Sequence, residues 1–139
     1  MSLPDSNAVI RAYLVSASAE TNPLITLVAD RVHCPRLPKG TTLPAVSFFT
    51  RGGKNTPYVP DIANPSVQFD CWGIDPVTAR NVYRKLYDAL QGIQNVAVVV
   101  GGASYSICSA EEEVEGQDLV DESIPNYFRT LTFFKFMIK

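Results

Sequence analysis

The sequence predicts an α+β fold, in which a mostly antiparallel sheet of about four to six strands is packed on one face by two helices. Three observations lead to this prediction. Short apolar or alternating segments recur between glycine and proline clusters, as strands do. Two other segments repeat apolar residues at helical spacing. The length of 139 residues suits one core, so we expect residues 1–139 to form a single domain.

The composition is that of a globular protein. Apolar residues make up 46% and charged residues 19%, which argues against disorder of the whole chain. No apolar run approaches the roughly 20 residues that span a bilayer, and the N-terminus lacks the order of a secretory signal. We therefore expect a soluble protein that is made in a cytoplasm and has no membrane partner.

The N-terminal third predicts a helix, a short helix and two strands. An amphipathic helix should follow a cap at Asp5 or Ser6, because apolar side chains recur at helical spacing at Ile10, Tyr13, Leu14 and Ala17. Asn22 before Pro23 is typical of the start of another helix, here of one or two turns. Strands are predicted at Arg31–Cys34 and Pro44–Arg51. The segment 52–65 contains two glycines and three prolines, so we expect a long exposed loop there.

The segment 67–92 gives the clearest local prediction. Apolar and polar residues alternate from Val67 to Cys71, as in a strand with one inward face. Gly73 allows the chain to leave the sheet, Asp75 can cap a helix, and Pro76 suits its first position. A strongly amphipathic helix should follow and stop at Gly92.

The C-terminal part continues the predicted sheet. A valine-rich strand at Asn95–Val100 leads through two glycines into a second strand at Ser104–Ser109. The segment Glu111–Glu122 contains seven acidic residues, so the acidic region 110–123 is either a solvated loop or the polar end of a long hairpin. Tyr127–Ile138 closes the chain as a long apolar strand.

Residue types that support catalysis are scarce. His33 is the sole histidine, so a hydrolytic triad would depend on it alone, and a structural role is the more common use of such a residue. The three cysteines, at positions 34, 71 and 108, lack zinc-ligand spacing and fit reduced thiols. The paired glycines lack the lysine of a phosphate-binding loop. We predict no enzymatic activity, no metal and no cofactor.

The order and spacing of several structural residues carry a resemblance to a known family. The stretch Val67-Gln68-Phe69-Asp70-Cys71-Trp72-Gly73 is followed by Asp75-Pro76 and by a helix that ends at residues 86–92 with the letters LYDALQG. Upstream, residues 27–32, 37–40 and 43–46 read LVADRV, LPKG and LPAV. Over about residues 8–110, this pattern resembles the tail-completion family of siphophage-like neck proteins. The acidic segment after Ala110 has no counterpart in that pattern.

The resemblance implies a structural virion protein rather than an enzyme. Such proteins close the phage tail or join it to the head connector, and they work as a ring, commonly of six copies. The implied partners are therefore the chain itself, the tail tube protein and the head connector proteins, with DNA passing through the channel without specific binding. The implied location is the neck or tail of the virion, assembled in the bacterial cytoplasm. The alternative is a small monomeric α+β module that binds a ligand or regulates another protein.

The candidate interface residues come from the charge distribution. Residues 1–92 carry nine basic and seven acidic side chains, whereas residues 93–139 carry three basic and seven acidic. A head-to-tail ring joins two different patches, so basic residues of the first part could meet the acidic segment of a neighbour. The candidates are Arg51, Lys54, Tyr58, Asp61, Glu111, Glu112 and Glu113.

Two alternatives compete with this use of the candidate residues. The acidic segment could instead line the channel, where negative charge would keep DNA from adhering. The segment 52–65 could act as an arm that orders against the next ring of the neck. Arg51, Lys54 and Tyr58 also have the residue types of a nucleic-acid contact, although an ordinary solvated loop is the more common reading of three such residues.

Overall fold

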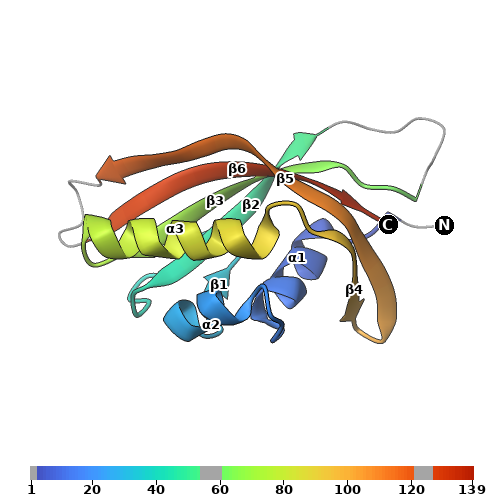
Figure 1. Ribbon diagram of the computed structural model, residues 1–139, viewed down its shortest axis with the longest axis horizontal. Helices are drawn as coiled ribbons and strands as arrows, with labels where there is room; N and C mark the ends of the chain where they lie inside the picture. Colours follow the sequence, from blue (N-terminus) through green and yellow to red (C-terminus); the bar gives the residue numbers. More distant parts are fainter. Residues whose placement is uncertain (1–2, 54–60, 121–126) are drawn as a thin grey trace.

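The protein has three helices and a single six-stranded sheet (Figure 1), and its α+β class is as predicted. The computed structural model describes residues 3–53, 61–120 and 127–139. The elements in chain order are α1 (Ser6–Val15), α2 (Asn22–Val28), β1 (Val32–His33), β2 (Ala45–Gly53), β3 (Pro65–Gly73), α3 (Pro76–Leu90), β4 (Gln94–Val100), β5 (Ala103–Val120) and β6 (Phe128–Ile138). The strand order is β1-β2-β3-β6-β5-β4, and β1 pairs with β2 in parallel while the other pairs are antiparallel.

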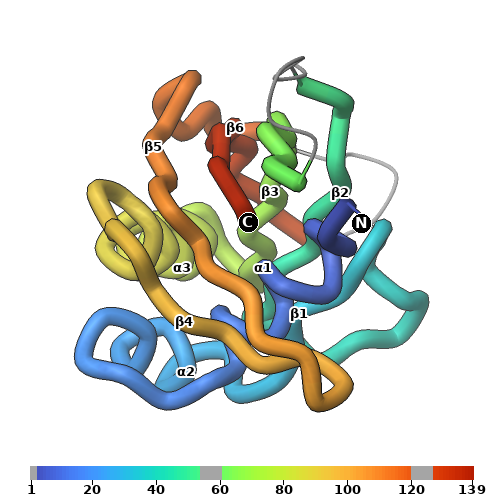
Figure 2. The backbone as a smooth tube through the Cα atoms, turned by 90° about the vertical axis from the view of Figure 1, so that its right-hand side faces the viewer, coloured from blue at the N-terminus to red at the C-terminus, as the bar shows by residue number. Residues whose placement is uncertain are grey.

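The helices lie together on one side of the sheet. Helix α3 runs along β3, β6 and β5, α2 packs against α3, and α1 packs against β4 at the other end. The sheet curls around them, so that β5 and β4 turn away from the plane of the remaining strands (Figure 2). The two longer helices pack on one face of the sheet as predicted, and the short helix expected after Asn22 is present as α2, which buries Leu24 and Val28.

The core is centred on Phe69 of β3. Its ring lies 5.5 Å from that of Phe48, 5.7 Å from that of Phe134 and 6.2 Å from that of Phe136, so three neighbouring strands contribute to one aromatic cluster. The helix α3 covers this cluster with the apolar stripe predicted from its spacing. All six residues of that stripe are buried, namely Ala79, Val82, Tyr83, Leu86, Ala89 and Leu90.

The turn from β3 into α3 follows the prediction residue by residue. The Asp75 carboxylate accepts a hydrogen bond of 2.7 Å from the backbone N–H of Thr78, and this bond lowers the pKa of Asp75. Pro76 occupies the first helical position. A side chain at Gly73 would place its Cβ 2.6 Å from the Ala79 nitrogen, so the close approach of strand and helix requires glycine. Gly92 has a left-handed φ of +78° just after the helix.

The elements before β2 differ in detail from the prediction. Asp5 caps α1 through the backbone N–H of Ala8, but the helix stops at Val15 because Ser16 is extended, so Ala17 lies beyond it. Thr21 rather than Asn22 precedes α2 as its cap residue. The predicted strand at 31–34 shortens to the two residues of β1.

The prediction that the acidic segment forms a solvated loop is wrong. Residues 103–120 form one continuous strand, β5, which pairs with β4 over its first part and with β6 over most of its length. The other prediction, the polar end of a long hairpin, is confirmed up to Val120, where β5 pairs with β6. Residues 121–126 lie outside the described part of the chain. An acidic segment can form a strand here because most of its side chains reach solvent on either side of the ladder.

The predicted loop at 52–65 is shorter than expected. The strand β2 continues to Gly53, which pairs with Pro65 at the start of β3. Ala63 exchanges two backbone hydrogen bonds with Ile138, of 2.8 Å and 2.9 Å, so residues near it are tied to the end of β6. Residues 54–60, which include Lys54 and Tyr58, lie outside the described residues.

A pair of phenylalanine substitutions tests the assignment of the two sheet faces. Phe69→Ala should lower the free energy of unfolding by about 3–5 kcal/mol, since it removes the buried centre of the aromatic cluster. Phe133→Ala, on the opposite face of the adjacent strand, should cost clearly less because its ring is half-exposed. Urea unfolding measures both values, and an equal or larger cost at Phe133 would contradict the assignment.

Candidate functional site

The sheet face that points away from the helices is the candidate functional surface. We call it the outer face. It is formed by alternate residues of four neighbouring strands, and no helix in the described ranges packs on it. Its members are Ser47, Phe49 and Arg51 of β2, Ser66, Gln68, Asp70 and Trp72 of β3, Arg129, Leu131, Phe133 and Lys135 of β6, and Glu111, Glu113, Val114 and Gln117 of β5.

The middle of the outer face is apolar. Phe49 and Phe133 flank Gln68 in one row across three strands, and Val114 continues the row on β5. Val114 is 48% exposed, and both phenylalanine rings are half-exposed. The guanidinium carbon of Arg51 lies 4.0 Å from the centre of the Phe133 ring, a cation–π contact that holds both side chains in place. The row therefore presents three large apolar side chains to solvent, with Gln68 between the two phenylalanines.

A second aromatic group lies toward the other end of the same strands. The indole Nε1 of Trp72 donates a 2.9 Å hydrogen bond to the Ser47 hydroxyl. The Tyr127 ring meets the indole edge to face at 6.2 Å, and the Arg129 guanidinium lies 5.5 Å from it. These contacts fix the orientation of the half-exposed indole.

A desolvated carboxylate lies between the two aromatic groups. Asp70 is only 8% exposed, and its two oxygens face Arg129 Nη1 and Gln68 Nε2, each at 3.4 Å. Burial raises the pKa of Asp70, while the Arg129 charge and the Gln68 hydrogen bond oppose that rise. Because both contacts are long, they offset only part of the cost of burial.

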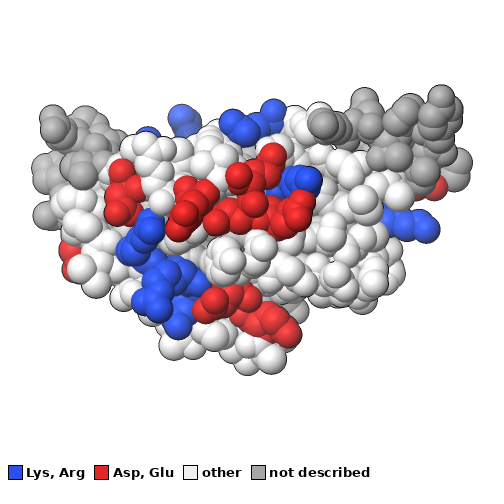
Figure 3. Space-filling view, turned by 45° about the horizontal axis from the view of Figure 1, so that its top comes forward, with Lys and Arg blue, Asp and Glu red and all other residues white. Residues whose placement is uncertain are grey.

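The acidic side chains of β5 are divided between the two faces of the sheet. On the outer face, Glu111 forms a 2.8 Å ion pair with Lys135, and Glu113 accepts a 2.6 Å hydrogen bond from Ser66. Glu112 points to the helix side, where it accepts hydrogen bonds from Tyr83 at 2.7 Å and Thr132 at 2.9 Å. Asp118 also faces that side and pairs with Arg80 on α3. Figure 3 shows acidic side chains in a row, with a Lys and Arg group beside them.

The ring of Tyr83 locks α3 against the acidic strand. Its hydroxyl accepts a 3.1 Å hydrogen bond from the Gly116 N–H, and its ring lies so close to Gly116 that a Cβ there would be 2.7 Å from the ring. Burial raises the pKa of Tyr83 to about 12. Glycine at this position therefore lets the strand pass over the ring, and the neighbouring glutamates are fixed relative to the helix.

The candidate residues from the sequence are only partly brought together. Arg51, Glu111 and Glu113 share the outer face, as an interface would require. Glu112 does not belong to it, because it is bonded to α3 and β6 on the other side. Asp61 is half-buried, and its Oδ1 has no hydrogen-bond partner among the described residues.

The sequence reasoning missed the apolar part of the outer face. Its main members are Phe49, Trp72, Leu131 and Phe133. A signal for Leu131 and Phe133 exists in the sequence, because β6 places large apolar residues at consecutive as well as alternate positions, so that some must face away from the core. Reading the strand by its two faces would have found them.

Other chemistry has little support among the described residues. No group of three or more His, Cys, Asp and Glu side chains is arranged there to hold a metal ion. None of the helices in this part of the chain is both long and apolar enough to cross a membrane. An open hollow of about 520 Å³ between α3 and β5 is lined by charged side chains and two tyrosines, and it contains no histidine or cysteine.

No protein-family model matches the chain, and no curated protein matches it.

Gly116→Ala tests the close packing of β5 on α3. We expect it to lower the free energy of unfolding by about 1–3 kcal/mol, because the new methyl group would collide with the Tyr83 ring. In a Tyr83→Leu background the same substitution should cost much less, since the ring is gone. Chemical denaturation of the four proteins in this cycle gives the coupling, and equal costs in both backgrounds would show that the ring contact is unimportant.

Asp70→Asn tests the desolvated carboxylate through pH. The folded-state pKa of Asp70 is raised above its ordinary value of 3.8, so the protein gains stability from this group as pH falls through the folded pKa. The gain in stability is complete below the pKa of Asp70 in the unfolded chain, and it is lost as pH rises through the higher pKa of the folded state. The wild type minus Asp70→Asn difference in stability should thus increase from pH 7 to pH 3, measured by thermal unfolding. If this stability difference decreased on acidification, the pKa of Asp70 would not be raised in the folded state.

Proposed function

We propose that the chain is a structural protein of a tailed bacteriophage, which assembles into a ring that completes the tail or joins it to the head connector. The proposal combines the resemblance of the sequence to tail-completion proteins with the character of the outer face. It names the chain itself, the tail tube protein and the head connector proteins as partners. The neck or tail of the virion is the corresponding location.

The observation that carries the proposal is an outer face with an apolar, aromatic centre and a charged rim. Protein interfaces are enriched in aromatic residues and arginine at their centre and are polar at their edge. The outer face has this arrangement, with Phe49 and Phe133 near the middle and Lys135, Glu111 and Glu113 beyond them. A surface of this kind is suited to another protein rather than to a small substrate.

The charges also fit a head-to-tail contact between copies. The basic residues Arg36 and Lys39 are exposed in the segment between β1 and β2, and Arg51 is exposed on β2. Glu111 and Glu113 are exposed on β5, which is separated from β2 in the sheet by β3 and β6. A ring uses two different patches of each subunit, so opposite charges on separate strands favour closure between neighbours.

The acidic residues of β5 could instead line the channel of the same ring. Carboxylates that line a passage repel the phosphate backbone, so DNA could pass without adhering. In the structure only Glu111 and Glu113 of the Glu111–Glu113 run point to the outer face, so either use depends on those two residues. Crosslinking from a cysteine introduced at Glu113 to a neighbouring subunit would favour the interface over the channel.

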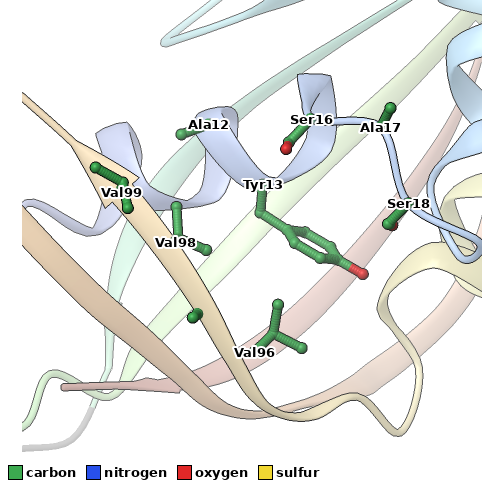
Figure 4. A pocket seen from close by; sticks show the side chains of 9 residues that line it. Ala12, Tyr13, Ser16, Ala17, Ser18, Val96, Val98 and Val99 are labelled. Atoms are coloured by element: carbon green, nitrogen blue, oxygen red, sulfur yellow. The ribbon is translucent and has the colours of Figure 1, made fainter.

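One observation favours the alternative of a ligand-binding module. A hollow of about 380 Å³ lies between α1 and β4, lined by Tyr13, Val96 and Val98 among others (Figure 4). Its volume is within the range of small-molecule sites. The hollow is open to solvent, and its lining has no charged side chain that could fix the orientation of a ligand. The ligand-binding module is therefore the second hypothesis after the phage protein.

Substitution at the centre of the outer face tests the proposed function. Phe133→Glu should leave the fold intact and abolish joining of the protein to isolated tails, since a charge would replace the apolar centre. Val77→Glu is the matched control, because Val77 is 70% exposed on α3, away from the outer face. Sedimentation with tails lacking the protein measures binding, and thermal unfolding checks the fold. Wild-type binding by a folded Phe133→Glu variant would refute this role of the outer face.

A further inference from the structure

The strand β4 ends the sheet with an open edge. It is the last strand in the order, and it pairs with β5 alone. After Asn95, which has a left-handed φ of +52°, β4 pairs regularly from Val96 to Val100. No backbone hydrogen bond joins this stretch to another described segment on its far side. The edge is therefore a row of backbone groups that only solvent satisfies in the free protein.

The pairing identifies which residues present those groups. Ser106 of β5 exchanges two hydrogen bonds with Lys139, so its backbone faces away from β4. Since antiparallel residues alternate in direction, Ile107 and its partner Val96 bond to each other, as do Tyr105 and Val98. The residues between them, Ala97 and Val99, must point their N–H and C=O groups outward. Both of their side chains are also exposed.

This edge lacks the features that usually protect a free strand. Natural proteins prevent such edges from pairing with another chain by means of lysine, proline, a bulge or a very short strand. β4 from Gln94 to Val100 contains no charged residue and no proline, and four of its seven residues are valine. The opposite edge strand, β1, is only two residues long. An unprotected, valine-rich edge favours pairing with another extended chain.

A hollow lies alongside this edge, on the helix side of β4. Val96 and Val98 point into it from the strand, and Tyr13 enters from α1 (Figure 4). Ser16 and Ser18 complete its rim, and its volume is about 380 Å³. The Tyr13 hydroxyl donates a 2.5 Å hydrogen bond to the Ala89 carbonyl, so the wall that this ring forms is anchored to α3. A side chain from a strand added beside β4 would enter this space.

We propose that the edge of β4 binds an extended segment of a partner polypeptide, which adds to the sheet as a further strand. The backbone of the segment bonds to Ala97 and Val99, and every second side chain packs into the hollow next to Val96 and Val98. The lining carries no charge, so the inward side chains of the segment are apolar or small and uncharged. This site lies apart from the outer face, and the inference does not depend on the ring.

A proline substitution tests whether binding of the segment depends on backbone hydrogen bonds at the edge of β4. Ala97→Pro removes one outward N–H and leaves the ladder to β5 unchanged, because Ala97 does not bond to β5. Ala97→Thr is the matched control, since it keeps the N–H and suits a strand. The probe is a short peptide selected on the wild-type protein from a random, ribosome-displayed library. Circular dichroism and thermal unfolding establish that both variants are folded.

The proposal predicts three results. Selected peptides alternate apolar, uncharged residues with variable ones. They bind Ala97→Pro at least about tenfold more weakly than the wild type, since a ladder hydrogen bond and the fit of the strand are lost, and they bind Ala97→Thr like the wild type. Amide exchange at Ala97 and Val99 slows in the complex.

Other results would overturn the proposal. Peptides without alternation, or with equal affinity for Ala97→Pro, would show that the edge is not the binding site. A wild-type dimer in light scattering that Ala97→Pro dissociates would show instead that β4 pairs with β4 of a second copy. Val99→Pro, with Val99→Thr as its control, repeats the test if Ala97→Pro fails to fold.

Discussion

The packing of Phe69 against Phe48, Phe134 and Phe136 determines which face of each central strand is buried. Because side chains alternate along a strand, burying this cluster under α3 forces the intervening residues of β2, β3 and β6 to the other side. Those residues include Trp72 and Phe133, whose rings no helix in the described residues covers. The outer face is therefore a direct consequence of the core.

The strand β5 departs from simple alternation in a way that matters for function. Its register shifts after Glu112 and again after Val114, so extra residues are inserted relative to β6. Glu111 reaches the outer face and Glu112 faces Tyr83, as regular alternation requires, and the shift after Glu112 then places the consecutive residues Glu113 and Val114 both on the outer face. One acidic run thus supplies a tie to α3 through Glu112 and solvent-exposed carboxylates on the outer face through Glu111 and Glu113. A charge count along the sequence cannot separate these two uses.

Much of the fold could be predicted because it rests on local chemistry. Asp75 and Pro76 begin α3 for reasons that act within one turn, and Val67 to Cys71 alternate as a strand should. The acidic strand and the bridge formed by Ala63 before β3 were harder to predict, because their conformation depends on pairing with β6, which lies distant in sequence. The outer face escaped notice for the same reason: its residues belong to separate strands, and their proximity is set by register alone.

We propose that this chain completes or joins a phage tail through its exposed protein surfaces. Electron micrographs of particles made by a phage that lacks only this protein test this role. We expect either tails of irregular length, if the ring ends tail growth, or normal tails separated from heads, if the ring joins them. Tails of normal length attached to full heads would contradict it.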